Sequence, residues 1–292
     1  MAARPNIPYF APAELLPAPL PTVAEILAST TRLSKEYENL VYRVGEHFAV
    51  KFGPGVHIQE GENMYFVQHS TQIRVPKVYA LFHDEKTNMD FIVQEYISGT
   101  DLDLVWGTLD TNQKQNIASQ LHRYLKELRS IPPPGYYGGI WRQPIRDFHF
   151  LDWDRDGQHY LDSLISGPHE TEDQWIEAMW QCVIKASVIR REPEDQYMLP
   201  LVRHYYQIIF KGHEPVFTHG NILPRNIMLQ EDGTVVLIDW ERAGWYPSYW
   251  EFCCTVNIVK YIDDWGSWIC KILDEEYVGQ LGWMQNHRNA IR

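Results

Sequence analysis

Short runs rich in β-branched and aromatic residues dominate the first hundred residues, and one stretch of helical period interrupts them. Gly45-Glu46 separates the first two runs, which predicts a hairpin. In the helical stretch, Met64 and Val67 fall on one face. The predicted order is strand, strand, helix, strand and strand, at residues 40–44, 47–52, 59–69, 75–79 and 90–96.

Proline marks the segment before these strands. Six of the 18 prolines fall within the first 21 residues. Because proline fixes φ and removes an N–H donor, this segment predicts an extended arm. A short helix at residues 22–27 is expected to follow it.

Helical spacing of leucine and isoleucine replaces the strand pattern after residue 99. The first helix begins at an Asp110-Thr111 cap and ends at a proline-rich stop at residues 131–135. Residues 136–170 show no clear period. The remaining predicted elements are helices at residues 174–186 and 196–210 and a strand–loop–strand unit at 217–240, with helix after it.

These patterns predict an α+β protein with three parts. We expect a proline-rich arm and short helix at residues 1–30, a small β-rich lobe at 31–98 and a larger helical lobe at 99–292.

Composition and charge narrow the class of protein. The 292 residues are 45% hydrophobic and 22% charged, which is typical of a globular chain. Their 26 basic and 38 acidic residues give a net charge of −12, which disfavours nucleic-acid and anionic-membrane partners. No apolar stretch approaches the roughly 20 residues that span a bilayer, and no secretory signal opens the chain. The four cysteines lack zinc-site spacing and indicate free thiols. We therefore expect a soluble, cytoplasmic protein.

The segment between residues 219 and 240 contains the candidate metal ligands. Asn226 and Asp239 stand thirteen residues apart, and Asp232-Gly233 provides a hairpin turn between them. The turn brings both side chains to the same end of the hairpin. An amide oxygen and a carboxylate are hard ligands suited to Mg²⁺, so the two residues are candidate metal ligands.

Ordered motifs over roughly residues 40 to 255 resemble the aminoglycoside phosphotransferase and choline kinase-like family of the protein-kinase-like superfamily. The similarity is greatest to its small filamentous-fungal members. It is carried by THGNILPRNIM at residues 218–228, IDWERAGWYPSYWEF at 238–252, VKFG at 50–53, Glu60 with Met64, VPKV at 75–78, and Glu95-Tyr96-Ile97 with Gly99. By contrast, the nucleophile elbow of hydrolases and the glycine fingerprint of dehydrogenases do not occur.

The resemblance implies a two-lobed, protein-kinase-like α+β fold that uses ATP and Mg²⁺. Lys51 matches the lysine that contacts the nucleotide α- and β-phosphates. Gln94, Glu95 and Tyr96 match the hinge that meets adenine through backbone groups. Asn226 and Asp239 match the Mg²⁺ ligands of the family.

Helix geometry indicates which carboxylate pairs with Lys51. Glu60 shares the inward face of its helix with Met64 and Val67, whereas Glu62 is expected to point to solvent. We therefore predict an ion pair between Lys51 and Glu60.

Two departures from the family pattern keep two functions open. Asn221 replaces the catalytic-loop Asp that orients the acceptor hydroxyl and accepts its proton; asparagine accepts a hydrogen bond but no proton at neutral pH. The stretch at residues 29–36 also lacks the glycines of a nucleotide-covering loop. The first interpretation is a slow ATP/Mg²⁺-dependent phosphotransferase acting on a small-molecule hydroxyl. The second is a pseudokinase-like protein that regulates through bound nucleotide or catalyses another small-molecule transformation.

The negative charge favours a neutral or cationic small-molecule acceptor. Glu241, just after Asp239, is a candidate acceptor contact, and so is Asp147. The acid-rich segment that begins at Asp147 either faces a cationic acceptor or forms a solvated loop, and we favour the loop; its other members are Asp152, Asp154, Asp156 and Asp162.

Histidine and aromatic residues receive structural interpretations. We expect the ring of His219 to bond nearby backbone. Surface positions are expected for His57, His69 and His83, and packing beneath the catalytic loop for Trp245, Tyr246, Pro247, Tyr249 and Trp250.

Overall fold

The computed structural model describes the chain except for residues 1, 35–39, 148–151, 154–158, 161–162, 191–194, 259–262, 274–276 and 292. Two compact units make up the fold. The N-terminal unit contains Met1–Gln113 and Leu223–Glu241, and the C-terminal unit contains Lys114–Ile222 and Arg242–Arg292. Among the described residues, no helix has the length and hydropathy needed to cross a bilayer.

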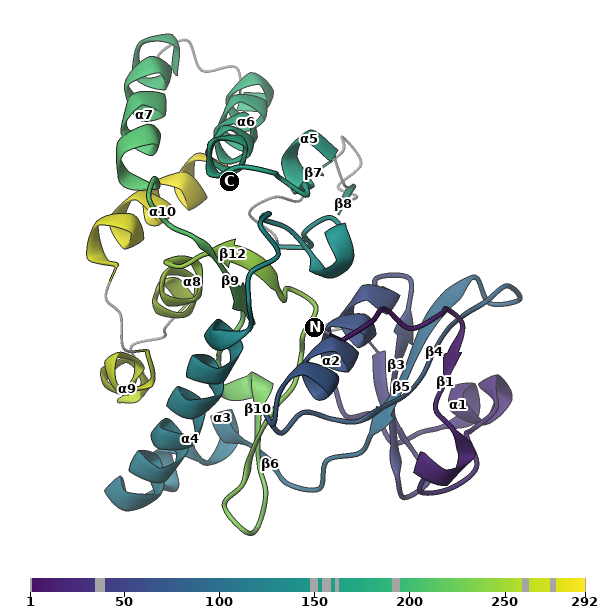
Figure 1. Cartoon of the computed structure of the whole chain (residues 1–292). Helices are drawn as coiled ribbons and strands as arrows, with labels where there is room; N and C mark the ends of the chain where they lie inside the picture. The colour runs from purple at the N-terminus through teal and green to yellow at the C-terminus, as the bar shows by residue number, and fades with distance from the viewer. Residues whose placement is uncertain are drawn as a thin grey trace. The chain divides into compact units, whose positions relative to one another are not determined.

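A five-stranded antiparallel sheet forms the centre of the N-terminal unit, in the order β1-β4-β5-β3-β2 (Figure 1). Gly45, at φ +63°, turns the predicted hairpin between β2 and β3. The strands are β1 (Tyr9–Phe10), β2 (Leu40–Val44), β3 (Phe48–Gly53), β4 (Val78–Asp84) and β5 (Met89–Glu95).

The prediction of a strand at residues 75–79 is wrong in position, because β4 begins only at Val78. Pro76 has no N–H to give to a neighbouring strand, so the sheet pairing starts after it. The Val78 N–H donates to the Gln68 side chain at 3.0 Å, and the register shifts between Val78 and Ala80.

Helix α2 (Ile58–Ser70) packs on this sheet, where a helix was predicted. Residues 59 to 64 of α2 are all buried, which a helix achieves only when other elements cover it on several sides. Gly61 meets the sheet directly, since a Cβ there would fall well inside the contact distance of Leu81.

The proline-rich arm is an integral part of the N-terminal unit. Its helix α1 (Val23–Ala28) begins with a capping box between Thr22 and Glu25, and Ile26 is fully buried. Before it come β1 at the sheet edge and a 3₁₀ turn at Ala13–Leu15.

The expectation that Glu62 points to solvent is wrong. Its side chain is 2% exposed, and Arg4 Nε lies 2.7 Å from its carboxylate. The arm covers the outer face of α2, and the periodicity of one helix does not reveal a covering segment from elsewhere in the chain.

A second, three-stranded sheet completes the N-terminal unit. Its strands are β6 (Thr100–Asp101), β10 (Ile227–Leu229) and β11 (Val235–Leu237), in the order β11-β10-β6. The short helices beside it are α3 (Leu102–Val105) and the 3₁₀ turns Trp106–Thr108 and Pro224–Asn226.

The C-terminal unit is mainly helical, and its predicted helices at 174–186 and 196–210 are confirmed. Its helices are α4 (Thr111–Ser130, which begins in the N-terminal unit), α5 (Ser163–Ser166), α6 (Glu172–Arg190), α7 (Asp195–Ile209), α8 (Trp250–Ile258), α9 (Trp265–Ile272) and α10 (Val278–Ala290). Short elements are the 3₁₀ turn Ile140–Arg142, the pair β9 (Pro215–Thr218) and β12 (Gly244–Pro247), and the pair β7 (Asp152–Trp153) and β8 (His159–Tyr160).

Aromatic packing forms the core of the C-terminal unit. Trp175 is fully buried and meets Trp250 edge to face at 5.1 Å, and Tyr246 stacks on Trp250 at 5.2 Å. Tyr249 and Trp245 are buried as well, so the aromatic residues at 245–250 are packing residues, as predicted.

Replacing Gly61 with alanine tests how closely α2 approaches the sheet. The new methyl group clashes with buried Leu81, and overpacking of this kind costs about 1–3 kcal/mol. Gly282→Ala in α10 is the matched control, since no described atom lies within 4 Å of its Cβ position. Both substitutions gain about 1 kcal/mol of helix propensity, so the clash alone separates them. In thermal melts we expect Gly282→Ala to raise Tm and Gly61→Ala to fall clearly below it. Equal shifts would contradict the close contact.

Candidate active site

Lys51 projects from β3 into a group of carboxylates within the N-terminal unit. Its Nζ lies 2.6 Å from Glu60 Oε2 and 3.3 Å from Asp239 Oδ1, and its side chain is 8% exposed. The predicted ion pair with Glu60 is therefore present. Burial by itself lowers the pKa of a lysine. Here the carboxylates of Glu60, Asp239 and Glu241 outweigh burial and hold the pKa of Lys51 above its usual range.

Three carboxylates meet at this lysine. Glu60, Asp239 and Glu241, here called the acidic cluster, each offer an oxygen within 4.8 Å of the others. Burial raises the pKa of Glu60, and the other two carboxylates act in the same direction against the opposing effect of Lys51. Three acids facing one ammonium leave an excess of negative charge, which a divalent cation would balance. Carboxylate oxygens are the donors that Mg²⁺ prefers, so the donor set fits this metal.

The acidic cluster depends on an unusual backbone at Asp239. Its φ is +66°, a left-handed conformation that is uncommon for any residue other than glycine. The neighbouring Trp240 is held from two sides. Asn63 Nδ2 donates to the Trp240 carbonyl at 2.8 Å, and the Trp240 indole donates to the Leu237 carbonyl at 3.1 Å. These bonds fix the turn that presents the Asp239 carboxylate.

Asn226 lies at the same end of the hairpin as Asp239, as the turn at 232–233 predicted. Ile227 pairs with Leu237 in the strand register, and the Ile238 N–H donates to the Asn226 carbonyl at 3.0 Å. Asn226 is buried, with 6% of its surface exposed. The hairpin therefore holds the two candidate metal ligands side by side across its strands.

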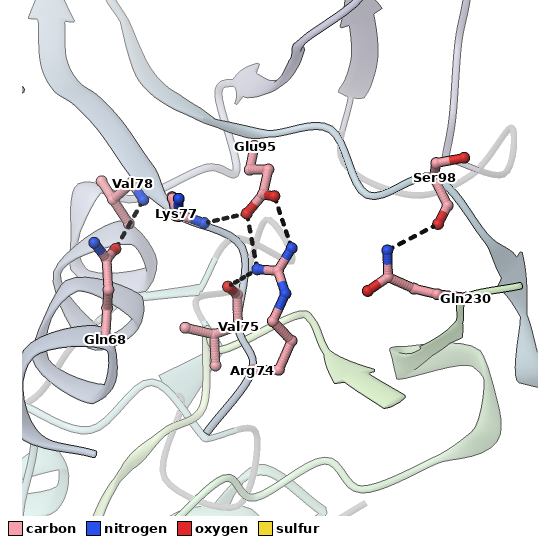
Figure 2. A network of polar contacts seen from close by, with 8 residues as sticks. All are labelled: Gln68, Arg74, Val75, Lys77, Val78, Glu95, Ser98 and Gln230. Carbon is pink, nitrogen blue, oxygen red and sulfur yellow. Dashed lines mark hydrogen bonds and ion pairs between the residues drawn. The ribbon is translucent and has the colours of Figure 1, made fainter. Parts of the chain in front are cut away.

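The residues predicted to form the hinge, Gln94, Glu95 and Tyr96, lie at the end of β5 and directly after it, and Glu95 is fixed by an ion pair. Figure 2 shows its carboxylate facing the Arg74 guanidinium, with bonds of 2.7 and 2.8 Å. The pair is bidentate, which is the strong geometry for arginine and carboxylate. The Arg74 carbonyl also accepts a hydrogen bond from the Leu237 N–H, so Arg74 links the end of β5 with the hairpin that carries Asn226 and Asp239.

Asn221 lies in the C-terminal unit on a loop that follows β9. The Asn221 N–H donates to His219 Nδ1 at 3.2 Å, which confirms the predicted bond between the His219 ring and nearby backbone. The backbone N–H groups of His219 and Gly220 donate to the Glu251 carboxylate at 2.7 and 3.0 Å. Gly220 has φ +78°, a conformation for which glycine is the natural residue.

Asp147 is completely buried, so the expectation of a solvated loop is wrong for this residue. Its carboxylate accepts a hydrogen bond from the Trp250 indole at 3.3 Å, and a buried carboxylate requires such partners. Asp152 lies in β7, while Asp154, Asp156 and Asp162 lie outside the described residues. The histidines predicted at the surface, His57, His69 and His83, are exposed.

Sequence reasoning assigned no role to Glu251, Asn63 or Arg74. Only Glu251 gave a usable signal, because it is the one charged residue in the mainly apolar α8. Burial raises the pKa of Glu251 to about 7, although the two backbone N–H bonds and Arg129 act in the opposite direction.

Glu251 gives a pH-dependent stability whose sign follows from this shift. Its folded pKa exceeds its unfolded value, so its contribution is complete below about pH 4.5 and is lost as pH rises through about 7. That loss is about 3 kcal/mol at most. We expect Glu251→Gln to flatten the fall in unfolding free energy between pH 4.5 and 8, measured by urea unfolding. Glu214→Gln, at an exposed position of the same unit, should leave the profile unchanged. A wild-type slope in Glu251→Gln would disprove the assignment.

Comparisons with known proteins establish the fold. The ADP-bound aminoglycoside phosphotransferase APH(2'')-Ib matches with a TM-score of 0.56 and 15% identity, over 89% of this chain and 80% of that one. The streptomycin–ATP–APH(2'')-IIa ternary complex gives 0.54 and 14% over 89% and 80%. The choline kinase LicA from Streptococcus pneumoniae gives 0.53 and 13% over 89% and 81%. The expected protein-kinase-like α+β fold is confirmed.

The sequence comparison assigns the family. A search of curated proteins finds no match. The model of the phosphotransferase enzyme family (APH) matches residues 29–290, nearly the whole chain. The resemblance seen in the motifs is therefore confirmed, and the chain belongs to the phosphotransferase enzyme family.

Proposed function

We propose that this protein transfers the γ-phosphoryl group of ATP to a hydroxyl group of a small molecule. The observation that carries the proposal is the buried ammonium of Lys51, held between Glu60 at 2.6 Å and Asp239 at 3.3 Å. A cation fixed by two acids from different elements suits binding of polyphosphate beside a metal. Membership of the phosphotransferase family supports the same chemistry.

In this proposal the residues of the N-terminal unit hold the nucleotide. Lys51 contacts the α- and β-phosphates, and Glu60 keeps its ammonium in position. Asp239, Asn226 and Glu241 hold Mg²⁺, which when bound neutralises and orients the phosphate oxygens. Glu241 then serves the metal, a role different from the acceptor contact expected from the sequence.

Adenine is recognised by backbone groups after β5. The N–H groups of Glu95 and Tyr96 already donate to the carbonyls of Lys77 and His47, each at 2.8 Å. Within the described part of the chain, the buried Ile97 has no such bond at its N–H. The base therefore takes its hydrogen bond from Ile97, next to the hinge residues that the sequence indicated.

Asn221 positions the acceptor. Its side-chain carbonyl accepts the hydrogen bond of the incoming hydroxyl but takes no proton. Because positioning and charge stabilisation supply most of phosphoryl transfer, the reaction proceeds slowly without a general base. Glu251 supports this residue by fixing the two preceding backbone N–H groups.

The proposed acceptor is a neutral or cationic small molecule. The net charge of −12 attracts cations and repels phosphorylated substrates. Streptomycin and choline, which appear in the names of two similar structures, both carry positive charge. Asp147 has no part in this proposal, because it is buried.

Binding of Mg·ATP should stabilise the protein. At a hundredfold excess over Kd, a ligand that binds only the folded state adds about 2.7 kcal/mol. We expect melts with millimolar Mg·ATP to show a higher Tm for the wild type and little change for Asp239→Asn, which keeps the size of the side chain. Asp103→Asn, an exposed aspartate of the same unit, is the matched control and should respond like the wild type. An unchanged Tm of the wild type with Mg·ATP would contradict the proposal.

Restoring the acid at position 221 should accelerate transfer. General-base catalysis contributes about 10²–10⁴ in rate, so we expect Asn221→Asp to raise turnover at least about tenfold with little change in nucleotide affinity. ATP consumption is measured against a panel of alcohols, amino alcohols and sugar phosphates. Binding of Mg·ATP without turnover by either form would favour the nucleotide-binding regulator instead. Preference for sugar phosphates would contradict the proposed acceptor class.

A further inference from the structure

Four successive residues of α2 are buried against four different parts of the N-terminal unit. Glu60 pairs with Lys51 on β3, and Gly61 lies against Leu81 on β4. The next two residues complete the set: Glu62 accepts bonds from Arg4, and Asn63 donates to the Trp240 carbonyl. Since these residues follow one another around a single turn of helix, no one of them moves without the others.

The N-terminal segment at residues 2–11, here called the strap, contacts α2 at three heights. The Ala2 N–H donates to Ser70 Oγ at 3.3 Å, and the ring of Tyr9 meets that of Tyr65 edge to face at 5.1 Å. Nearer the start of α2, Arg4 binds the Glu62 carboxylate with Nε and Nη2 at 2.7 and 3.3 Å.

The far end of the strap is anchored in the sheet. Tyr9 and Phe10 pair with Leu81 and Ala80 of β4, and the Ala11 N–H donates to the Tyr79 carbonyl at 2.8 Å. Figure 1 shows the segment starting beside α2 and continuing into β1. The strap therefore joins α2 to the sheet on which the helix lies.

The ion pair of the strap engages a buried charge on α2. The Glu62 side chain is 2% exposed, whereas that of Arg4 is 50% exposed. Removing the partner of a buried charge leaves that charge without compensation and is strongly destabilising. In a chain without the Arg4 guanidinium, a turn of the helix that brings Glu62 to water would relieve this cost, and the same turn would carry Glu60 away from Lys51.

We propose that the strap holds α2 in the position where Glu60 pairs with Lys51, and that Arg4 is a positioning residue for Lys51. The structural part of this inference stands on the contacts of Arg4, Glu62 and Glu60. Only its consequence for catalysis rests on the proposed function.

The experiment measures the accessibility of the Lys51 ammonium by lysine labelling with an N-hydroxysuccinimide acetate ester and mass spectrometry. Exposed Lys86 in the same unit is the internal reference. We expect Arg4→Ala to label Lys51 at least about fivefold faster than the wild type, since local opening sets the reactivity of a buried group. Arg32→Ala is the matched control. It removes an arginine beside β2, at the opposite edge of the sheet, and should leave labelling unchanged.

A double variant separates the ion pair from general packing. Arg4→Ala/Glu62→Met removes the buried charge together with its partner, so nothing drives the helix to turn, and Lys51 should regain its protection. Unchanged labelling in Arg4→Ala would overturn the proposal. So would a double variant that labels as fast as Arg4→Ala. Far-ultraviolet circular dichroism of each variant checks that it is folded.

The catalytic consequence has a separate readout. We expect Arg4→Ala to raise the KM for Mg·ATP more than it lowers kcat, and the double variant to restore KM. If the wild type fails to bind nucleotide, the proposed function falls, while the labelling still tests the strap.

Discussion

A lysine ammonium removed from water needs acids on more than one side, and in this protein that requirement ties together distant parts of the chain. Glu60 comes from the helix that follows β3, but Asp239 lies 188 residues beyond Lys51. The N-terminal unit is therefore complete only when the hairpin at residues 223–241 has joined it. The ion pair therefore closes a loop of 188 residues, and the entropic cost of that closure is offset only when the hairpin has docked.

The C-terminal unit also buries a charged side chain, in this case the carboxylate of Glu251. Two backbone N–H groups of the loop, those of His219 and Gly220, donate to the Glu251 carboxylate, and the charge of Arg129 also stabilises its ionised form. Backbone donors cannot reorient as side chains do, so the acid and the loop fix each other. Asn221 is the next residue in the loop, so these bonds also restrict the position of its backbone.

Patterns along the chain predicted α2 and four of the five strands of the central sheet, one of them out of position, because each depends on neighbouring residues. The pairing of Lys51 with Glu60 followed from the family resemblance together with the inward face of α2. Sequence patterns failed for Glu62 and Asp147, whose burial depends on Arg4 and on Trp250, 58 and 103 residues away. A helix face with polar residues is exposed only if no other segment of the chain packs on it. The order of the motifs along the chain predicted the fold, whereas the partners of individual acids depend on segments that only folding brings together.

The N-terminal stretch also closes the central sheet at both ends. Residues 31–33 bond to β2 at one edge, and β1 covers β4 at the other. An open edge strand is a template for strand addition by another molecule. Pro8 and Pro12 flank β1 and offer no N–H to a further strand, so the sheet stops there. Removing the N-terminal residues through β1 would expose the edge of β4, and the resulting open edge would favour aggregation.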